Sequence, residues 1–595
     1  MVKKRALFKL ITALSVLIVF SSSICISGCS YIRHQSDTID DYVSGEITYE
    51  EAVDELIDES EDLVDAIVEN VDDFLSIDSE SFVPFDPDNS FSYCDQPVCK
   101  YNKDSQEIEF TIHFNKIPAS DDYYIYLFDM ATYEDDESFA CKRYVASAPK
   151  DNTVIFHFAY EDKFLFSRFV PVVAYDKSFH PLSLGQFISN PEDISDHDTP
   201  YPEVDSKKGI LLDPLTIDKP ELESLNVKRV VYNLPLSFIM GETDNESCPT
   251  VDYEYLGKTY QFNGYMLEGF DNLFAYLSKN NYHVTAVILN DWNEKYPEIM
   301  HPLSRVKTGR SLYYAFNTEE EDGVRLMEAA ATFLAKRYSG GEYGLIHDWV
   351  IANEVNQHKM WNYMNIDDLT LYATSFEKSF RTFYNAIKSN NNNARVYYSL
   401  DHDWNSNGGR NYLRFNGKDF LNTFNEIAKS RGDYDWSLSI HPYPQPLTNT
   451  RFWYGNYDKT EDTRQITPMN LTALTDYMQK DEFLDTNGNV RQIAVTELGF
   501  SSYAGESAQA AAFAYCYYII NDNEFINSFL MNRQTDSYLS LQSGLALGIY
   551  NPDYSSKPIG DVFAQIDTDE GEEYIPKMLE IIGAGSLEEA LDRAR

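Results

Sequence analysis

The sequence predicts an α/β protein: a (β/α)8 TIM barrel preceded by a small antiparallel β-sandwich domain and an acidic helical spacer. Three observations lead to this prediction. From about residue 209 short apolar runs alternate with amphipathic stretches at helical spacing, whereas in 85–208 the apolar residues recur with a period of two. The length of 595 residues also exceeds what one hydrophobic core organises, so several domains are expected.

The N-terminus has the layout of a secretory signal, with a basic start, an apolar stretch and then small residues. The four residues from Ile26 to Cys29, Ile-Ser-Gly-Cys, resemble a bacterial lipobox, which implies that Cys29 is lipidated and becomes the mature N-terminus. A simple signal anchor is the alternative. We expect 1–29 to be a lipoprotein signal peptide and the protein to be exported to the cell surface. The lipid would hold it on the bacterial membrane, because each buried methylene contributes about 0.8 kcal/mol.

Residues 30–84 form an acidic segment that we interpret as a helical spacer. Within it, Thr48 and Glu51 make a capping box, and apolar residues then recur at three and four positions up to Phe74. The whole chain carries 48 basic and 95 acidic residues, a net charge of −47. Such a surface repels phosphate backbones, which excludes nucleic acid as an expected partner.

The β-sandwich domain is predicted for 85–208 from short runs such as "EIEFTIHF", "YYIYLFDM" and "NTVIFHFAY". Modules of this kind bind carbohydrate or serve as spacers against a catalytic domain, and both roles are open here. Cys94 and Cys99 form either a small disulfide or two free thiols. No Cys or His spacing predicts a metal site, and we expect no cofactor.

The barrel is predicted for 209–570, followed by a C-terminal helical tail at 571–595. Eight strand–helix units over roughly 340 residues match this fold. A doubly wound sheet is the alternative, but no G-x-G-x-x-G or Walker sequence follows a strand to support nucleotide binding. The predicted strands are 227–236, 283–291, 312–317, 347–354, 395–401, 436–441, 491–497 and 526–532.

Two glutamates end predicted strands of this barrel. Glu354 follows four apolar residues at the end of the fourth strand, and Glu497 ends the seventh. In this fold the carboxyl ends of the strands carry the chemistry, because their side chains meet in one pocket. An unpaired buried carboxylate is costly, and one alone would be taken as a structural partner. Two on opposed strands are the minimum apparatus for cleaving a glycosidic bond.

The sequence resembles a known group of enzymes at these positions. Asn-Glu at 353–354, Glu497, and His-Pro-Tyr at 441–443 resemble the retaining glycoside hydrolases of clan A. More closely, "WVIANEVN", "MWNYM" and "VTELGF" resemble a bacterial barrel family catalogued only as a domain of unknown function and related to that clan. The resemblance implies that Glu354 is the general acid and base and that Glu497 is the nucleophile.

Further site residues follow from the same resemblance. It implies that Asn353 hydrogen-bonds the sugar 2-hydroxyl, that Tyr443 positions Glu497, and that His441 lines the pocket. Three tryptophans follow predicted strands closely enough to stack on sugar rings, although each is also read as a possible loop anchor. They are Trp292, Trp361 and Trp404. The Asp-His-Asp-Trp stretch at 401–404 is a further candidate for binding sugar hydroxyls.

The sequence therefore predicts a lipid-anchored extracellular glycoside hydrolase that cleaves polysaccharide or oligosaccharide with retention. The alternatives are a non-catalytic carbohydrate-binding lipoprotein and a transglycosylase that uses the same two glutamates. A two-lobed sugar receptor would not need an opposed pair of glutamates. Sugar type, linkage and endo or exo action depend on loop shapes that the fold class does not supply, and the oligomeric state is open.

Overall fold

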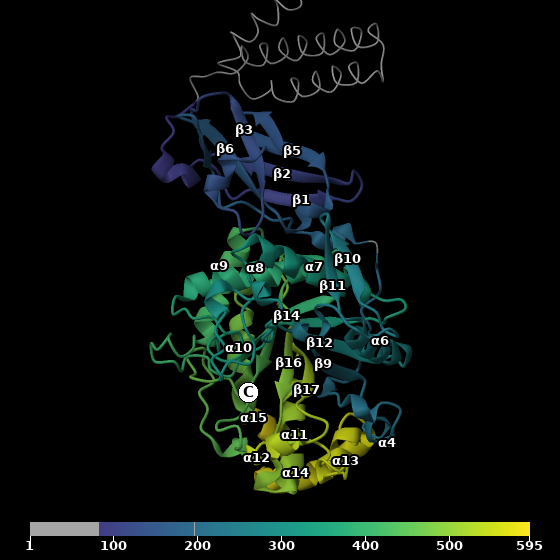
Figure 1. The fold of residues 1–595 in the computed structure, drawn as a ribbon. Helices are drawn as coiled ribbons and strands as arrows, with labels where there is room; N and C mark the ends of the chain where they lie inside the picture. The colour runs from purple at the N-terminus through teal and green to yellow at the C-terminus, as the bar shows by residue number, and fades with distance from the viewer. Residues whose placement is uncertain (1–81, 196) are drawn as a thin grey trace, which may run out of the picture. The chain divides into compact units, whose positions relative to one another are not determined.

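The computed structural model describes residues 82–595 except residue 196. The predicted signal peptide, Cys29 and almost all of the predicted spacer therefore lie outside the described residues. Residues Val83–Arg595 form one compact unit. No helix in this described part is both long and apolar enough to cross a membrane. Figure 1 shows the antiparallel sheets followed along the chain by the barrel and its helices.

The N-terminal β-region consists of two antiparallel sheets, as the period of two predicts. In β2 the apolar side chains of Ile108, Phe110 and Ile112 are buried and alternate with more exposed residues. The two sheets are in contact, since the rings of Phe158 and Phe169 lie 5.2 Å apart between centroids. One sheet contains β1 (Val98–Asn102), β2 (Glu107–His113) and β5 (Thr153–Ala159), and the other β4 (Ala146–Pro149), β3 (Tyr124–Met130), β6 (Arg168–Tyr175) and β7 (Ser178–Pro181).

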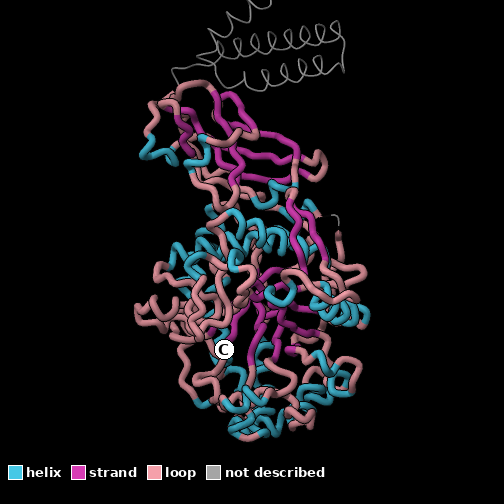
Figure 2. Tube along the Cα trace, viewed as in Figure 1, coloured by secondary structure: helices cyan, strands magenta, loops and turns pink. Residues whose placement is uncertain are grey.

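Eight parallel strands close into a barrel, which confirms the predicted fold class. Figure 2 shows these strands at the centre, surrounded by helices and loops. The interior is a packed core because the inward side chains of the strands fill it. In order around the barrel the strands are β8 (Lys208–Leu211), β9 (Arg229–Pro235), β12 (His283–Leu289), β13 (Asp348–Ile351), β14 (Arg395–Asp401), β15 (Ser437–His441), β16 (Ile493–Leu498) and β17 (Ile526–Met531).

Two of the strand predictions need correction. Residues 312–317 are not a barrel strand; they form isolated bridges to loop residues, and Tyr314 and Phe316 are buried against neighbouring aromatic rings instead. The first barrel strand is β8, which the sequence analysis missed. Gly209 is required there because a Cβ atom would lie 2.3 Å from Leu530. The two errors cancel, so β13 is still the fourth strand and β16 the seventh.

Amphipathic helices follow the strands and cover the barrel. Their sequences carry the expected caps, such as Asn263 before α6 and Asp368 before α8, whose side chains accept backbone N–H groups. The C-terminal helices pack on α11, where the Tyr515 hydroxyl donates to the carbonyl of Ala590 at 2.6 Å. The main helices are α6 (Gly264–Lys279), α7 (Glu321–Arg337), α8 (Leu369–Lys388), α9 (Gly417–Ser430), α10 (Leu471–Met478), α11 (Glu506–Asp522), α13 (Pro558–Gln565), α14 (Ile575–Ile582) and α15 (Leu587–Asp592).

Shorter elements complete the described chain. A hairpin of β10 (Val251–Tyr255) and β11 (Lys258–Phe262) lies between β9 and α6 in sequence. Two short helices, α5 (Leu236–Ile239) and α12 (Tyr538–Gln542), follow the carboxyl ends of β9 and β17. The cysteines from Cys94 onward are free thiols in the structure, so the proposed Cys94–Cys99 disulfide is not formed.

Candidate active site

Glu354 lies just beyond the carboxyl end of β13, on a segment with an unusual backbone. Ala352 and Glu354 have φ values of 63° and 40°, in the left-handed region that non-glycine residues rarely adopt. The neighbouring strand β14 holds this segment: the N–H of Glu354 donates to the Ser399 hydroxyl at 2.8 Å, and the N–H of Val355 donates to the Ser399 carbonyl at 2.9 Å. Such backbone costs about 1–3 kcal/mol per residue and is concentrated at functional sites.

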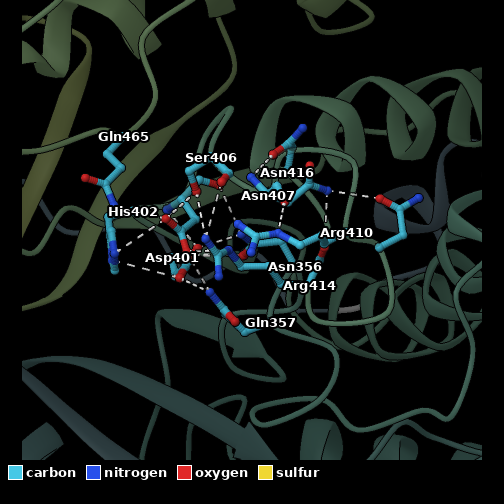
Figure 3. A network of polar contacts seen from close by, with 12 residues as sticks. Asn356, Gln357, Asp401, His402, Ser406, Asn407, Arg410, Arg414, Asn416 and Gln465 are labelled. Carbon is cyan, nitrogen blue, oxygen red and sulfur yellow. Dashed lines mark hydrogen bonds and ion pairs between the residues drawn. The ribbon is translucent and has the colours of Figure 1, made fainter.

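A network of side chains holds the same segment in place (Figure 3). The amide of Asn356 donates to Asp401 at 2.6 Å, and its oxygen accepts the N–H of Asp401 at 3.0 Å. Gln357 donates to Asp401 and, at 3.1 Å, to Asp403. Arg414 pairs with Asp403 at 2.7 Å. Because these protein donors engage both buried carboxylates, Asp401 and Asp403 position the Glu354 segment.

Glu497 lies in β16, where two donors fix one oxygen of its carboxylate. The Tyr443 hydroxyl and the Asn532 amide each donate to Oε1 at 3.0 Å, and the Asn532 amide also lies 2.9 Å from the Tyr443 hydroxyl. Within the described residues no side chain hydrogen-bonds to the other oxygen, Oε2. The contact with Tyr443 is the one that the sequence resemblance implies.

His441, the last residue of β15, joins the surroundings of the two glutamates. Its Nδ1 lies 3.0 Å from Oε1 of Glu354, and its Nε2 lies 3.1 Å from the Thr496 hydroxyl. One carboxylate oxygen of Glu354, one of Glu497 and one His441 ring nitrogen all lie within 4.8 Å of one another. The barrel thus brings the two predicted glutamates face to face.

The surroundings shift the pKa values of Glu354 and His441. Burial raises the pKa of Glu354 to about 7, and the negative charges of Asp401 and Glu497 act in the same direction. The hydrogen bond and charge of His441 oppose that rise. Burial by itself would lower the pKa of His441, but the hydrogen bond with Glu354 and the nearby carboxylates outweigh it and raise the pKa. Glu354 can therefore carry a proton near neutral pH.

A cavity of about 180 Å³ opens beside these groups at the carboxyl ends of the strands. Of the predicted site residues, Asn353, Trp361, His441 and Glu497 line it, whereas Glu354 and Tyr443 are not among its lining residues. The lining residues that were not predicted as site residues include Asn532 and Arg533 after β17, and Thr496 in β16. A signal for Asn532 was present, since it ends the predicted strand 526–532 in the same way that Glu497 ends 491–497.

The other two tryptophans have different positions. Trp404 is 0% exposed, and its indole N–H donates to the carbonyl of Glu461 at 2.9 Å. The prediction that Trp404 stacks on a sugar is therefore wrong, because the loop after β14 folds it into the core. Trp292 is partly buried against Tyr314 and is not among the residues that line the cavity.

A larger cavity of about 850 Å³ lies at the opposite, amino-terminal ends of the strands, next to His283 and His347. The two imidazoles stack with centroids 4.6 Å apart. Burial lowers their pKa values, to about 2 for His283 and about 4 for His347, so both are neutral at pH 7. In this fold that end of the barrel supports stability, and the chemistry is at the other end.

Comparison with known protein families identifies the family to which this chain belongs. Residues 200–590 match the family described as a family of unknown function (DUF5722). The chain belongs to this family. The match confirms the resemblance of the three sequence motifs to a family of that kind. No curated protein matches the sequence.

Several solved structures align with this DUF5722 chain at low identity. A family 39 glycoside hydrolase from Bacteroides cellulosilyticus WH2 has 13% identity and a TM-score of 0.41, with 76% of this chain and 78% of that chain covered. A beta-glucosidase from Pyrococcus furiosus has 12% identity and a TM-score of 0.40, with 62% of this chain and 86% of that chain covered. The beta-glycosidase from Thermosphaera aggregans has 14% identity and a TM-score of 0.39, with 59% of this chain and 85% of that chain covered.

Proposed function

We propose that this protein is a glycoside hydrolase that cleaves glycosidic bonds with retention through Glu354 and Glu497. The observation that carries the proposal is the placement of the two carboxylates, with oxygens within 4.8 Å of each other at the carboxyl ends of β13 and β16. Carboxyl groups about 5–5.5 Å apart favour retention, whereas about 6.5–9.5 Å leaves room for the water of an inverting enzyme. The short spacing supports the retaining mechanism.

The first step would use the two groups in different protonation states. The Glu497 carboxylate attacks the anomeric carbon while the bond to the leaving oxygen breaks, and protonated Glu354 donates its proton to that oxygen. In the second step the Glu354 carboxylate takes a proton from water, whose oxygen attacks the anomeric carbon and releases Glu497. The raised pKa of Glu354 suits this exchange, because a group that is acid and then base works best near the operating pH.

The surrounding residues would orient the reacting groups. Tyr443 and Asn532 fix one oxygen of Glu497 and leave Oε2 to attack. Asn353 lines the cavity and would hydrogen-bond a sugar hydroxyl, a contact that strengthens in the transition state. If a sugar hydroxyl replaced the water in the second step, the same residues would carry out transglycosylation. If the protein bound carbohydrate without turning it over, it would be a carbohydrate-binding lipoprotein.

The proposal is tested by incubating the purified protein with a panel of polysaccharides, oligosaccharides and aryl glycosides, followed by product analysis. NMR of the first-formed product reports the anomeric configuration. A retained product is expected, and an inverted one would exclude the covalent mechanism. No turnover of any member, together with measurable binding on a glycan array, would favour the carbohydrate-binding alternative.

The activity should depend on pH through Glu354. The group must be protonated to act as an acid, so kcat/KM should fall as pH rises through about 7. His441→Asn removes a hydrogen bond and a charge that lower the pKa of Glu354, so the falling limb should move to higher pH. The measurement is kcat/KM against pH for both proteins. A limb that stays in place or moves to lower pH would contradict this role of His441.

We also propose that the protein is held on the cell surface by a lipid on Cys29. Cys29→Ser should prevent lipid attachment and release the protein into the medium or leave it unprocessed, because one or two acyl chains are expected to supply the retention. Cell fractionation measures the change. Cys141→Ser is the matched control, since Cys141 is an exposed free thiol in the β-region. Membrane retention that is the same in both variants would rule out the lipobox.

A further inference from the structure

A second, larger cavity adjoins the candidate active site on one side. It has a volume of about 1160 Å³ and is formed by residues in and after the carboxyl-terminal parts of β8 and β9, residues after β17, and one side of α6. Leu211, Asn233 and Arg533 line both this groove and the 180 Å³ cavity that contains Glu497. The groove and the active-site cavity therefore lie side by side and share these three residues.

Aromatic side chains are concentrated along this groove. Tyr538 of α12 is 73% exposed and Phe238 of α5 is 49% exposed, although large apolar side chains are usually covered. Three half-buried tyrosines line the same groove: Tyr232, Tyr276 and Tyr554. Exposed aromatic residues gathered in a groove mark a ligand site, because flat rings supply apolar area at low entropic cost.

Two polar residues lie at the junction, where the groove meets the active-site cavity, and are available to a ligand. Asn233 is exposed, and Arg533 is partly exposed between the groove and the cavity. In the part of the chain that the structure describes, no hydrogen bond or ion pair engages the Arg533 guanidinium, in a protein with 95 acidic residues. Its five N–H donors remain for an acceptor outside the protein. Small-molecule sites are usually lined by apolar and aromatic side chains with a few polar groups that fix the orientation of the ligand.

The volumes of the cavity and the groove indicate which part of a long ligand each would hold. The cavity with Glu497, at about 180 Å³, is below the roughly 300–1,000 Å³ of typical ligand pockets, whereas the groove exceeds that range. Only a small part of a longer molecule fits beside the glutamates. The rest would pass Arg533 and Asn233 and lie on the aromatic rings.

We propose that this groove binds the continuing sugar chain of the substrate, so that the protein cleaves oligosaccharides or polysaccharides with several sugars at a higher kcat/KM than monoglycosides or disaccharides. This inference rests on the proposed glycosidase function for its active-site end. Phe238 and Tyr538 would each stack on a sugar ring in the groove, and Arg533 would donate to oxygens of the sugar at the junction.

The test compares substrates of different length in a groove variant. The double variant Phe238→Ala/Tyr538→Ala should lower kcat/KM for long oligosaccharides by about 10- to 100-fold, from two lost ring contacts of about threefold to tenfold each. Hydrolysis of a 4-nitrophenyl glycoside, which reaches only the cavity, should fall far less. Phe91→Ala is the matched control, because Phe91 is also 49% exposed but lies in the β-region. Equal losses on short and long substrates would overturn the inference.

A binding measurement separates this inference from the proposed function. Glu497→Gln, which should be inactive, is applied to a glycan array with and without the two groove substitutions. Loss of binding to the longer glycans on substitution supports the groove even if no hydrolysis is ever detected. Binding that the substitutions leave unchanged, or binding to no glycan at all, overturns the groove while leaving any measured hydrolysis of aryl glycosides intact.

Discussion

Glu497→Ala should lower kcat by roughly 10⁴- to 10⁶-fold, the range expected when a covalent nucleophile is removed. The reason is geometric: within the described residues, Glu354 and Glu497 are the carboxylates brought together beside the cavity, and Glu354 is engaged by His441. No other carboxylate of residues 82–595 with the gap at 196 forms such a cluster with Glu354 and His441, so none replaces Glu497 as the nucleophile. Steady-state kinetics on the most reactive aryl glycoside measures the loss.

Two further variants serve as controls for the loss of kcat in Glu497→Ala. Glu342→Ala changes an exposed glutamate on the loop before β13, at the opposite end of that strand from Glu354, and should leave kcat unchanged. Glu497→Gln keeps the size of the side chain and should retain glycan binding while losing turnover. Near-normal kcat in Glu497→Ala would remove this residue from the chemistry.

Glu354→Ala should lower kcat/KM by about 10²- to 10⁴-fold for substrates with poor leaving groups, the usual contribution of general acid–base catalysis. Substrates with very good leaving groups need no proton and should still form the glycosyl-enzyme, which then persists because its base is missing. Added azide needs no deprotonation and should attack that intermediate. We expect faster turnover and a glycosyl azide with retained configuration, assigned by NMR.

The configuration of the azide product distinguishes the two glutamates. In Glu497→Ala, azide would occupy the place of the missing nucleophile, so any glycosyl azide should have the inverted configuration. An inverted product from Glu354→Ala and a retained one from Glu497→Ala would mean that the two roles are exchanged. Full activity in both variants would place the chemistry outside this pocket.

Local sequence patterns were enough to locate most of the barrel. Seven of its eight strands overlap predicted runs, because short apolar segments between amphipathic helices form a pattern that is visible without tertiary information. The missed strand β8 has only four residues. Its buried Lys208 pairs with Asp567 at 2.6 Å, and no local pattern reveals a partner 359 residues away.

Burial of individual aromatic residues was not predictable in the same way. Trp361 and Trp404 both follow strand ends in loops, yet Trp361 lines the cavity and Trp404 has no exposed surface. Position after a strand places a residue near the carboxyl-end face of the barrel. Whether its ring faces the cavity or the core depends on how the loops pack on one another.

The sequence by itself determined that Glu354 and Glu497 share one end of a parallel barrel, because strand ends are fixed by local periodicity and all parallel strands end at the same face. Only the tertiary structure decided that His441 contacts Glu354, that Asn532 holds Glu497 together with Tyr443, and that Arg533 lies between the cavity and an aromatic groove. These contacts join residues tens to hundreds of positions apart. They follow from loop packing across the barrel, which the hydrophobic pattern of each segment does not encode.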